Sequence, residues 1–234
     1  GINFALHYRA LRGKPLFYLK DKETVFFLSV IIIAVIFVSM DVFQISDDSF
    51  FNIIQKSVFQ VVSIVTTTGY GTADFEQWSA SSKIILFILM FMGGCAGSTG
   101  GGMKMIRSII LIKFGLNEIK RLIHPQAVLP VRVGSMVIPK DIVTNIGGFF
   151  LLYMAIFVTG ILVMSGLGLD FETSFGSVAA TINNIGPGLG GVGPTDNYAH
   201  IPVVGKWVLA FLMLVGRLEV FTVIILFSPS YWRK

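Results

Sequence analysis

Two short glycine-containing stretches of this sequence have the residue types that could line a path for a dehydrated cation. They are residues 66–71 (TTTGYG) and 183–188 (NNIGPG), and each lies between long apolar segments. Glycine and proline break helices, and irregular backbone survives in a membrane only where it is buried in protein or lines a water-filled path. The Thr-x-Gly-Tyr-Gly order of the first stretch matches the known pattern of a potassium-selective filter, whose backbone carbonyls replace the hydration shell of the ion. The candidate ligands are the carbonyls of Thr67, Thr68, Gly69, Tyr70, Asn184, Ile185, Gly186 and Pro187.

The composition indicates a membrane protein. Hydrophobic residues make up 54% of the chain and charged residues 13%, which excludes an ordinary soluble domain. The net charge of +5 would suggest a nucleic-acid partner for a soluble chain, but in a membrane protein the placement of charge matters more, and we expect no nucleic-acid partner. The single cysteine, Cys95, excludes an internal disulfide.

Apolar segments predict the helices that position the first stretch. Residues 24–42 are almost uncharged and extend about 28 Å at 1.5 Å per residue, so we expect an outer helix that crosses the bilayer. Residues 52–65 are too short to span and run directly into the first stretch, which predicts a re-entrant pore helix. Residues 84–92 begin an inner helix, glycine-rich residues 93–102 interrupt it, and weaker apolar character resumes over residues 103–114. Glycine costs about 1 kcal/mol relative to alanine inside a helix, so we expect this inner helix to be broken in its middle.

The same plan repeats after a basic, proline-containing connection over residues 113–140. Residues 142–165 predict a second outer helix, and residues 171–183 predict a second short pore helix. Residues 185–193 predict a second filter-like loop, and residues 206–227 predict a second inner helix.

The two halves align when Gly69 is placed on Gly186. In the inner helices, aligned separately, residues 83–93 match residues 206–216, and both runs begin at lysine and end at glycine. Internal repeats are common in transporters. We therefore expect an all-α polytopic membrane protein with two consecutive repeats of outer helix, pore helix, filter loop and inner helix. Its expected parts are a cytoplasmic segment (1–22), a first pore repeat (23–112), a cytoplasmic connection (113–140), a second pore repeat (141–228) and a cytoplasmic tail (229–234).

The distribution of charge predicts the orientation. Most of the 18 Lys and Arg residues lie in the amino-terminal segment, the connection and the tail. The positive-inside rule therefore predicts that both termini and the connection are cytoplasmic. Both filter-like loops would then open outward into an acidic vestibule, which would raise the local concentration of cations. The acids on this outer side are Asp41, Asp47, Asp48, Asp74, Glu76, Asp170, Glu172 and Asp196.

The glycine-rich residues 93–102 have two alternatives to a role in permeation. A phosphate-binding loop needs Gly-Lys followed by Ser or Thr, whereas Met103 follows Gly102, which disfavours nucleotide binding. The other alternative is a flexible kink. Neither a metal cluster nor an enzyme is expected, because the histidines are scattered and no two carboxylates lie deep in a predicted span; the histidines are His7, His124 and His200.

Arg217 is a charged residue within the apolar second inner helix. Charges inside a membrane are costly, face protein or water, and indicate function by default. The structural alternative is an ion pair with Glu219 in the same helix. That pair would be poor, because residues two apart do not share a helix face.

Residues 67–71, residues 184–190 (NIGPGLG) and the glycine-rich break together resemble the Trk/Ktr/HKT superfamily of potassium transporters. The resemblance covers essentially the whole chain, as the third and fourth of the family's four pore repeats. It implies one key glycine in each filter loop, here Gly69 and Gly186. It also implies a gating loop under the filter that blocks permeation until it moves, and a contact between Arg217 and this loop from below the cavity.

The implied gate comprises residues of the glycine-rich break and two cations. Lys104 would be either a cavity charge or a side chain that snorkels to the cytoplasm. The residues are Gly94, Ala96, Gly97, Ser98, Thr99, Gly100, Gly101, Lys104 and Arg217.

The expected function is potassium transport across the bacterial inner membrane, with potassium as the transported ion and no organic cofactor. A tandem-pore potassium channel, completed by a second chain, is one alternative; a non-transporting membrane scaffold or receptor is another. The resemblance further implies a missing amino-terminal half with two more pore repeats, a homodimer, and a cytosolic TrkA-type nucleotide-binding regulatory ring. The sequence leaves open whether transport is passive or coupled to protons or sodium.

Overall fold

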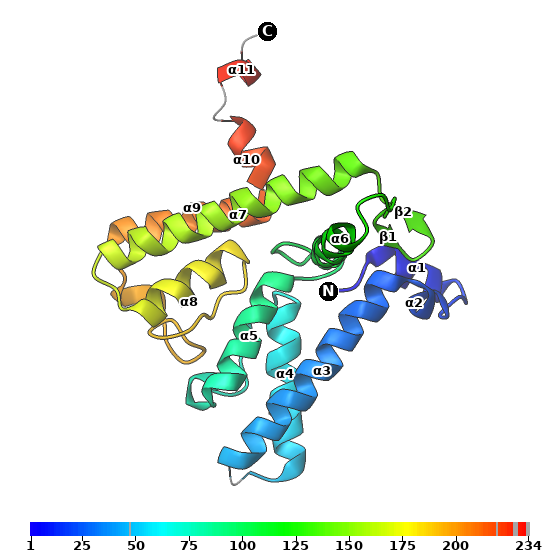
Figure 1. The fold of residues 1–234 in the computed structure, drawn as a ribbon. Helices are drawn as coiled ribbons and strands as arrows, with labels where there is room; N and C mark the ends of the chain where they lie inside the picture. Colours follow the sequence, from blue (N-terminus) through cyan, green and yellow to red (C-terminus); the bar gives the residue numbers. More distant parts are fainter. Residues whose placement is uncertain (47, 219, 227–228, 233–234) are drawn as a thin grey trace.

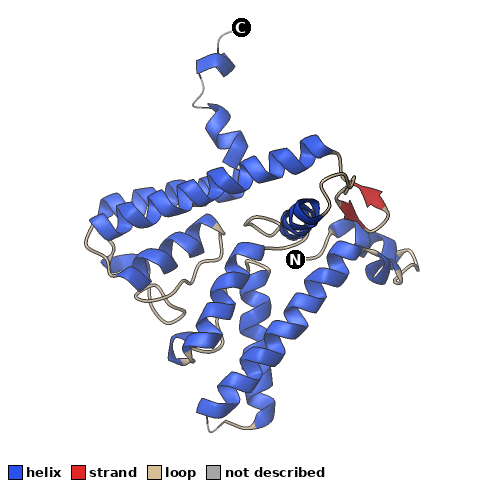
Figure 2. Cartoon of the chain, in the orientation of Figure 1, coloured by secondary structure: helices blue, strands red, loops and turns tan. Residues whose placement is uncertain are grey.

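The computed structural model describes residues 1–46, 48–218, 220–226 and 229–232 of the chain. Their fold is mostly helical, as predicted, with one addition in the expected connection (Figure 2). This addition is a short antiparallel hairpin of β1 (Arg132–Val133) and β2 (Met136–Val137). Several positions used in the sequence argument lie outside the described residues. They are Asp47, Glu219, the end of the expected second inner helix at residues 227–228, and residues 233–234.

The first group of helices surrounds the first filter-like stretch. α3 (Lys22–Ile45) is a long helix capped at its start by the side chain of Asp21. α4 (Phe50–Val65) packs against α3 and ends at the first stretch. α5 (Ala80–Met92) packs against both and stops at Gly93, whose φ of +65° is in the left-handed region that favours glycine.

α6 (Met105–Ile123) resumes the helix after the glycine-rich break and packs against α7 (Lys140–Gly166). Figure 1 shows α6 between the two groups of helices. The helix continues beyond the predicted end near residue 114. Its later residues include the strong helix formers Leu, Glu, Lys and Arg, so the added charges do not end the helix.

The second group surrounds the second filter-like stretch. α8 (Phe171–Ile182) packs against both α7 and α9 (Val203–Leu218), and α7 lies beside α9 in Figure 1. The outer connection contains the short η2 (Tyr198–His200). Among the described residues, two helices, α3 and α7, are long and apolar enough to cross a membrane. They correspond to the two predicted outer helices.

The predicted inner helix over residues 206–227 differs from the structure. α9 ends at Leu218, and α10 (Val220–Leu226) points away from it in Figure 1, followed by α11 (Pro229–Trp232). The physical reason is packing on α7: Val220 and Val223 are buried, and the ring of Phe221 lies 6.0 Å from that of Phe149. At the other end of the chain, α1 (Phe4–Leu11) and α2 (Phe17–Lys20) precede α3.

An aromatic cluster joins the two groups. Phe91 of α5 lies 5.1 Å from Phe157 of α7, measured between ring centroids, and Phe87 lies 5.7 Å from Phe175 of α8. Phe157 and Phe175 are themselves 5.5 Å apart. Each such pair contributes about 0.5–1.5 kcal/mol beyond the area it buries. The cluster therefore fixes the two groups, and the loops that they carry, relative to each other.

Asp41 joins the C-terminal end of α3 to the start of α5. Its carboxylate accepts hydrogen bonds from the hydroxyls of Ser79, Ser81 and Ser82, that of Ser81 over 3.0 Å. Ser79 is also the N-cap of α5, so the negative charge lies at the positive end of the helix dipole.

Replacing Asp41 by alanine is expected to lower the thermal stability of the full-length protein in detergent. The change removes one acceptor shared by three hydroxyls, and hydrogen bonds to charged groups contribute about 1.5–3 kcal/mol. The midpoint of thermal unfolding is the measurement. Asp48→Ala is the control, because Asp48 pairs with Lys56 on the surface, with side-chain exposures of 36% and 39%. Equal midpoints for Asp41→Ala and the unmodified protein would contradict a stabilising role.

Candidate functional site

The two short helices, α4 and α8, end with the same three hydrogen bonds. In each, three successive backbone N–H groups donate to the carbonyls four, three and five residues earlier in the chain. This pattern is a Schellman cap. The pairs coincide when Gly69 is placed on Gly186, so the loops share their local geometry. The bonds after α4 are Thr66 N to Val62 O (3.0 Å), Thr67 N to Ile64 O (3.0 Å) and Thr68 N to Ser63 O (2.8 Å); those after α8 are Asn183 N to Ala179 O (3.2 Å), Asn184 N to Thr181 O (3.0 Å) and Ile185 N to Ala180 O (2.9 Å).

The turn residue of each cap is in the left-handed region although it is not glycine. Thr67 and Asn184 both have φ of 56°. Asparagine tolerates this region, whereas a β-branched threonine is strained there by an amount of order 1–3 kcal/mol. The Thr67 hydroxyl accepts the backbone N–H of Gly101 over 2.9 Å, and the Asn184 amide donates to the carbonyl of Met213 over 3.1 Å. Each turn residue is thus tied to a different inner element.

The two loops approach each other closely. We call residues 66–71 the first loop and residues 183–193 the second loop. A Cβ added at Gly69 would lie 1.8 Å from the carbonyl oxygen of Ile185 and 3.3 Å from the ring of Pro187. Gly69 also has φ of +78° and Gly186 has φ of +117°. Only glycine fits at position 69, where the neighbouring atoms belong to the backbone of the second loop.

The predicted ligand carbonyls fall into two groups. The carbonyl of Tyr70 accepts the hydroxyl of Ser63, and that of Gly186 accepts the hydroxyl of Tyr198, each over 2.6 Å. A carbonyl oxygen has a second lone pair, so these two keep one site each. Neither hydroxyl was predicted. Within the described residues, no hydrogen bond is donated to the carbonyls of Thr67, Thr68, Gly69, Asn184, Ile185 and Pro187.

The glycine segment, residues 93–102, folds against both loops. Besides its bond to Thr67, Gly101 is so close to the second loop that an added Cβ would lie 2.7 Å from the carbonyl oxygen of Asn183. A Cβ at Gly102 would lie 3.0 Å from the side-chain oxygen of Asn183, which accepts the hydroxyl of Tyr153 over 2.8 Å. The segment therefore contacts the two loops at their junction with the short helices.

Two cations contact carbonyls of the glycine segment. Arg217, near the end of α9, donates from Nη1 to the carbonyl of Thr99 over 2.8 Å. Lys104, just after the segment, donates from Nζ to the carbonyls of Ser98, over 3.4 Å, and Gly100. The Lys104 ammonium thus lies against the loop that precedes it.

Further contacts hold the segment in place, and the sequence did not reveal them. The N–H of Ala96 donates to the Glu23 carboxylate over 2.7 Å, and Glu23 is only 8% exposed. The carbonyl of Gly97 accepts the N–H of Phe4 over 3.1 Å. The sequence signal for Glu23 was its place in the first turn of an apolar helix. Within the segment, Ser98 donates to the Cys95 carbonyl over 2.6 Å, and Gly94 accepts the N–H of Met105 over 2.9 Å.

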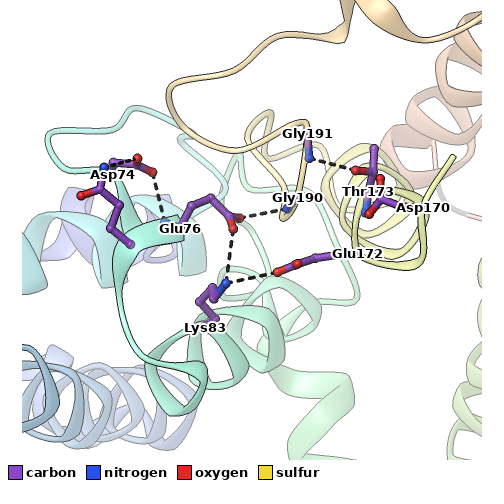
Figure 3. A network of polar contacts seen from close by, with 9 residues as sticks. Asp74, Glu76, Lys83, Asp170, Glu172, Thr173, Gly190 and Gly191 are labelled. Carbon is purple, nitrogen blue, oxygen red and sulfur yellow. Dashed lines mark hydrogen bonds and ion pairs between the residues drawn. The ribbon is translucent and has the colours of Figure 1, made fainter.

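A third set of contacts, the outer network, joins Glu76, Lys83, Glu172 and Gly190 (Figure 3). Glu76 belongs to η1 (Phe75–Gln77), which follows the first loop, whereas Gly190 belongs to the second loop. Burial raises the pKa of the Glu76 carboxyl, and the Lys83 ammonium opposes this rise. The sequence identified Glu76 and Glu172 as vestibule acids but not their contacts. Within the described residues, no group of three or more His, Cys, Asp or Glu side chains is placed to hold a metal ion.

Comparison with known proteins places this arrangement in a family. The family model of the TrkH cation transport protein matches residues 1–234. The Trk system potassium uptake protein TrkH of Halomonas elongata is 41% identical over 99% of this chain and 48% of its own length. TrkH of Salmonella typhimurium is also 41% identical, over 100% of this chain and 48% of its own length.

A solved structure agrees with these relatives. The crystal structure of the potassium transporter TrkH from Vibrio parahaemolyticus matches with a TM-score of 0.91 and 40% identity, covering 99% of this chain and 50% of that chain. The chain spans about half the length of the curated relatives it matches. Because the family model covers the whole sequence, this chain belongs to the TrkH family of cation transport proteins.

Proposed function

We propose that the full-length protein transports potassium across the bacterial inner membrane, and that this chain supplies two of the four loops of its selectivity filter. The observation that carries the proposal is the meeting of two identically capped loops, with Gly69 against the carbonyl of Ile185. Carbonyls without a hydrogen-bond donor among the described residues are suited to a dehydrated cation. Potassium is the ion named for the relatives from Halomonas and Salmonella.

The short helices add electrostatic attraction. The carboxyl end of a helix carries a partial negative charge of about half an elementary charge. α4 and α8 both end at the loops, so both ends would attract a cation that has passed the filter. Acids of the outer vestibule would raise the cation concentration at the entrance.

The proposed architecture has two pore repeats in this chain, over residues 23–112 and 141–228. Residues 1–22, 113–140 and 229–234 would be cytoplasmic, as the positive-inside rule predicts. A four-fold filter needs two further loops. This chain covers only about half the length of its relatives, so we expect the two further loops in an amino-terminal half of the full-length protein.

The glycine segment is the proposed gate. Its contacts with Thr67 and Asn183 of the two loops support this proposal, as do the bonds from Arg217 and Lys104 to its carbonyls. Opening would require these bonds to break. By family resemblance the protein would form a homodimer and sit on a TrkA-type nucleotide-binding ring that regulates this step; co-purification with such a ring would test that part.

Alanine at Gly69 or Gly186 is expected to reduce rubidium uptake by cells that express the full-length protein by at least about tenfold. At Gly69 the new methyl group would overlap the Ile185 carbonyl, and at Gly186 a φ of +117° is strained for alanine. Backbone strain of this kind costs of order 1–3 kcal/mol, and about 1.4 kcal/mol corresponds to a factor of ten in rate. Gly115→Ala in α6 is the matched control, because no atom lies within 4 Å of its added Cβ.

The same uptake measurement separates the alternatives. A scaffold or receptor would keep folding and membrane insertion in both filter variants and would show no rubidium uptake of its own. If Gly69→Ala and Gly186→Ala are inserted into the membrane and their rubidium uptake is unaltered, the proposal that these loops form a filter is wrong. A tandem-pore channel would require two copies of this chain to complete one ring, so two further pore loops in the amino-terminal half of the same protein would exclude it.

Weakening the gate is expected to raise rubidium flux. Arg217→Ala removes the donor to the Thr99 carbonyl, and deletion of residues 97–101 removes the segment itself. Initial rates of uptake, normalised to inserted protein, are the measurement. Arg121→Ala is the matched control, because Arg121 pairs with Glu118 on the exposed face of α6. Unchanged flux in both gate variants would count against a gate at this position.

A further inference from the structure

The two loops are held in place by groups of different origin. In the alignment of Gly69 with Gly186, Ala73 corresponds to Gly190. The carbonyl of Ala73 accepts the side-chain amide of Gln60 over 2.7 Å, a bond from the short helix of the same repeat. The N–H of Gly190 donates instead to Glu76 Oε1 over 3.0 Å, a bond from the other repeat. Ser177 corresponds to Gln60, and its short side chain bonds within its own helix.

A second hydrogen bond shows the same difference. Ser63 of α4 holds the carbonyl of Tyr70 in the first loop. The corresponding residues of the second repeat are Ala180 and Pro187, and Ala180 has no hydroxyl to donate. The hydroxyl of Tyr198, from η2, donates to the second loop in its place. The second repeat thus lacks counterparts of both bonds that Gln60 and Ser63 of α4 make in the first repeat.

Gly190 lies wedged between Glu76 and the first turn of α8. It has φ of +69°, and an added Cβ would lie 2.7 Å from the backbone nitrogen of Thr173. Next to it, the N–H of Gly191 donates to the Thr173 hydroxyl over 2.9 Å. Gly193 is also close, since its added Cβ would lie 2.8 Å from Glu76 Cγ. The Glu76 side chain therefore packs along the part of the second loop that returns from the predicted ligand carbonyls.

Lys83 lies against this carboxylate and is paired with it. Its Nζ lies 3.4 Å from Glu76 Oε2 and 3.2 Å from Glu172 Oε1. The side chains of Glu76 and Lys83 are 19% and 23% exposed, so their interaction is partly shielded from solvent, whereas Glu172 is 51% exposed. Both oxygens of Glu76 are used, one by Gly190 and one by Lys83 (Figure 3).

We propose that Glu76 is a positioning residue for ion selectivity: it holds the second loop through the Gly190 N–H, with Lys83 as its counter-ion. The inference rests on the proposed filter function. Discrimination between potassium and sodium depends on the arrangement of the coordinating carbonyls. Besides its cap and the Thr173 bond, which come from α8, the second loop is bonded to Glu76 and Tyr198, so the arrangement of its carbonyls depends in part on Glu76.

The test separates the hydrogen bond from the charge, using two matched variants of the full-length protein. Glu76→Asp keeps the charge, but its side chain is one methylene shorter and does not reach Gly190. Glu172→Gln removes a charge from the same network and leaves the bond to Gly190 intact. The measurements are the KM for rubidium uptake and the inhibition of that uptake by sodium, which together give the rubidium-to-sodium preference.

Glu76→Asp is expected to reduce the preference about fivefold or more, the order expected for loss of a charge-assisted hydrogen bond. Glu76→Gln should retain more of the preference than Glu76→Asp, because its amide oxygen can still accept the Gly190 N–H. Glu172→Gln should change the apparent affinities for both ions alike and leave the preference unchanged.

Other outcomes overturn the inference. In one such outcome, Glu76→Asp keeps the rubidium-to-sodium preference of the unmodified protein, and Glu76→Asp and Glu172→Gln change the KM for rubidium by the same factor. The network would then act only by attracting cations. If the unmodified protein takes up no rubidium, the proposed function fails and this inference fails with it. If the unmodified protein discriminates and Glu76→Asp discriminates equally well, the proposed function stands and the positioning role alone is refuted.

Discussion

One constraint governs the rest of the structure: a backbone carbonyl at membrane depth must have a hydrogen-bonding or ionic partner. Water is absent there, so each carbonyl needs a hydrogen-bond donor or a cation. α4 and α8 end within the packed protein, and each end is closed by a cap with a left-handed residue, Thr67 or Asn184. The cap satisfies the last helical carbonyls and turns the chain away, and most of the predicted ligand carbonyls that follow lack a donor from the described residues; those of Tyr70 and Gly186 are the exceptions. A cation is the partner that this arrangement favours.

Close approach of one backbone to another explains where glycine is required. A Cβ at Gly216 of α9 would lie 1.8 Å from the carbonyl oxygen of Ile182, at the end of α8. Gly93, which the sequence aligns with Gly216, stands at the end of α5 with φ of +65°. The two aligned glycines therefore serve different purposes: one lets two helices approach, and the other ends a helix. An alignment of residue types shows neither purpose.

What could be predicted from the sequence depended on local patterns. The length of the two uncharged apolar segments predicted the two outer helices, and the high proportion of glycine in residues 93–102 predicted the break between α5 and α6. The bonds from Tyr198 to Gly186 and from Glu76 to Gly190 could not be predicted, because the side chain and its partner meet only through packing of separate elements. The packing of α10 on α7 could not be predicted for the same reason: its residues are mostly apolar and equally compatible with a continuous helix.

The second loop is bonded to several separate elements, and α9 is one of these elements. The carbonyl of Met213 accepts the side-chain amide of Asn184, at the turn into the second loop. Arg217 lies four residues further along α9, on the same face of the helix, and donates to Thr99 of the glycine segment. One helix face thus contacts the second loop and the proposed gate together. A displacement of α9 large enough to release Thr99 would also act on Asn184, and movement of the glycine segment would break the bond between Gly101 and Thr67, so the proposed gating would act on both loops.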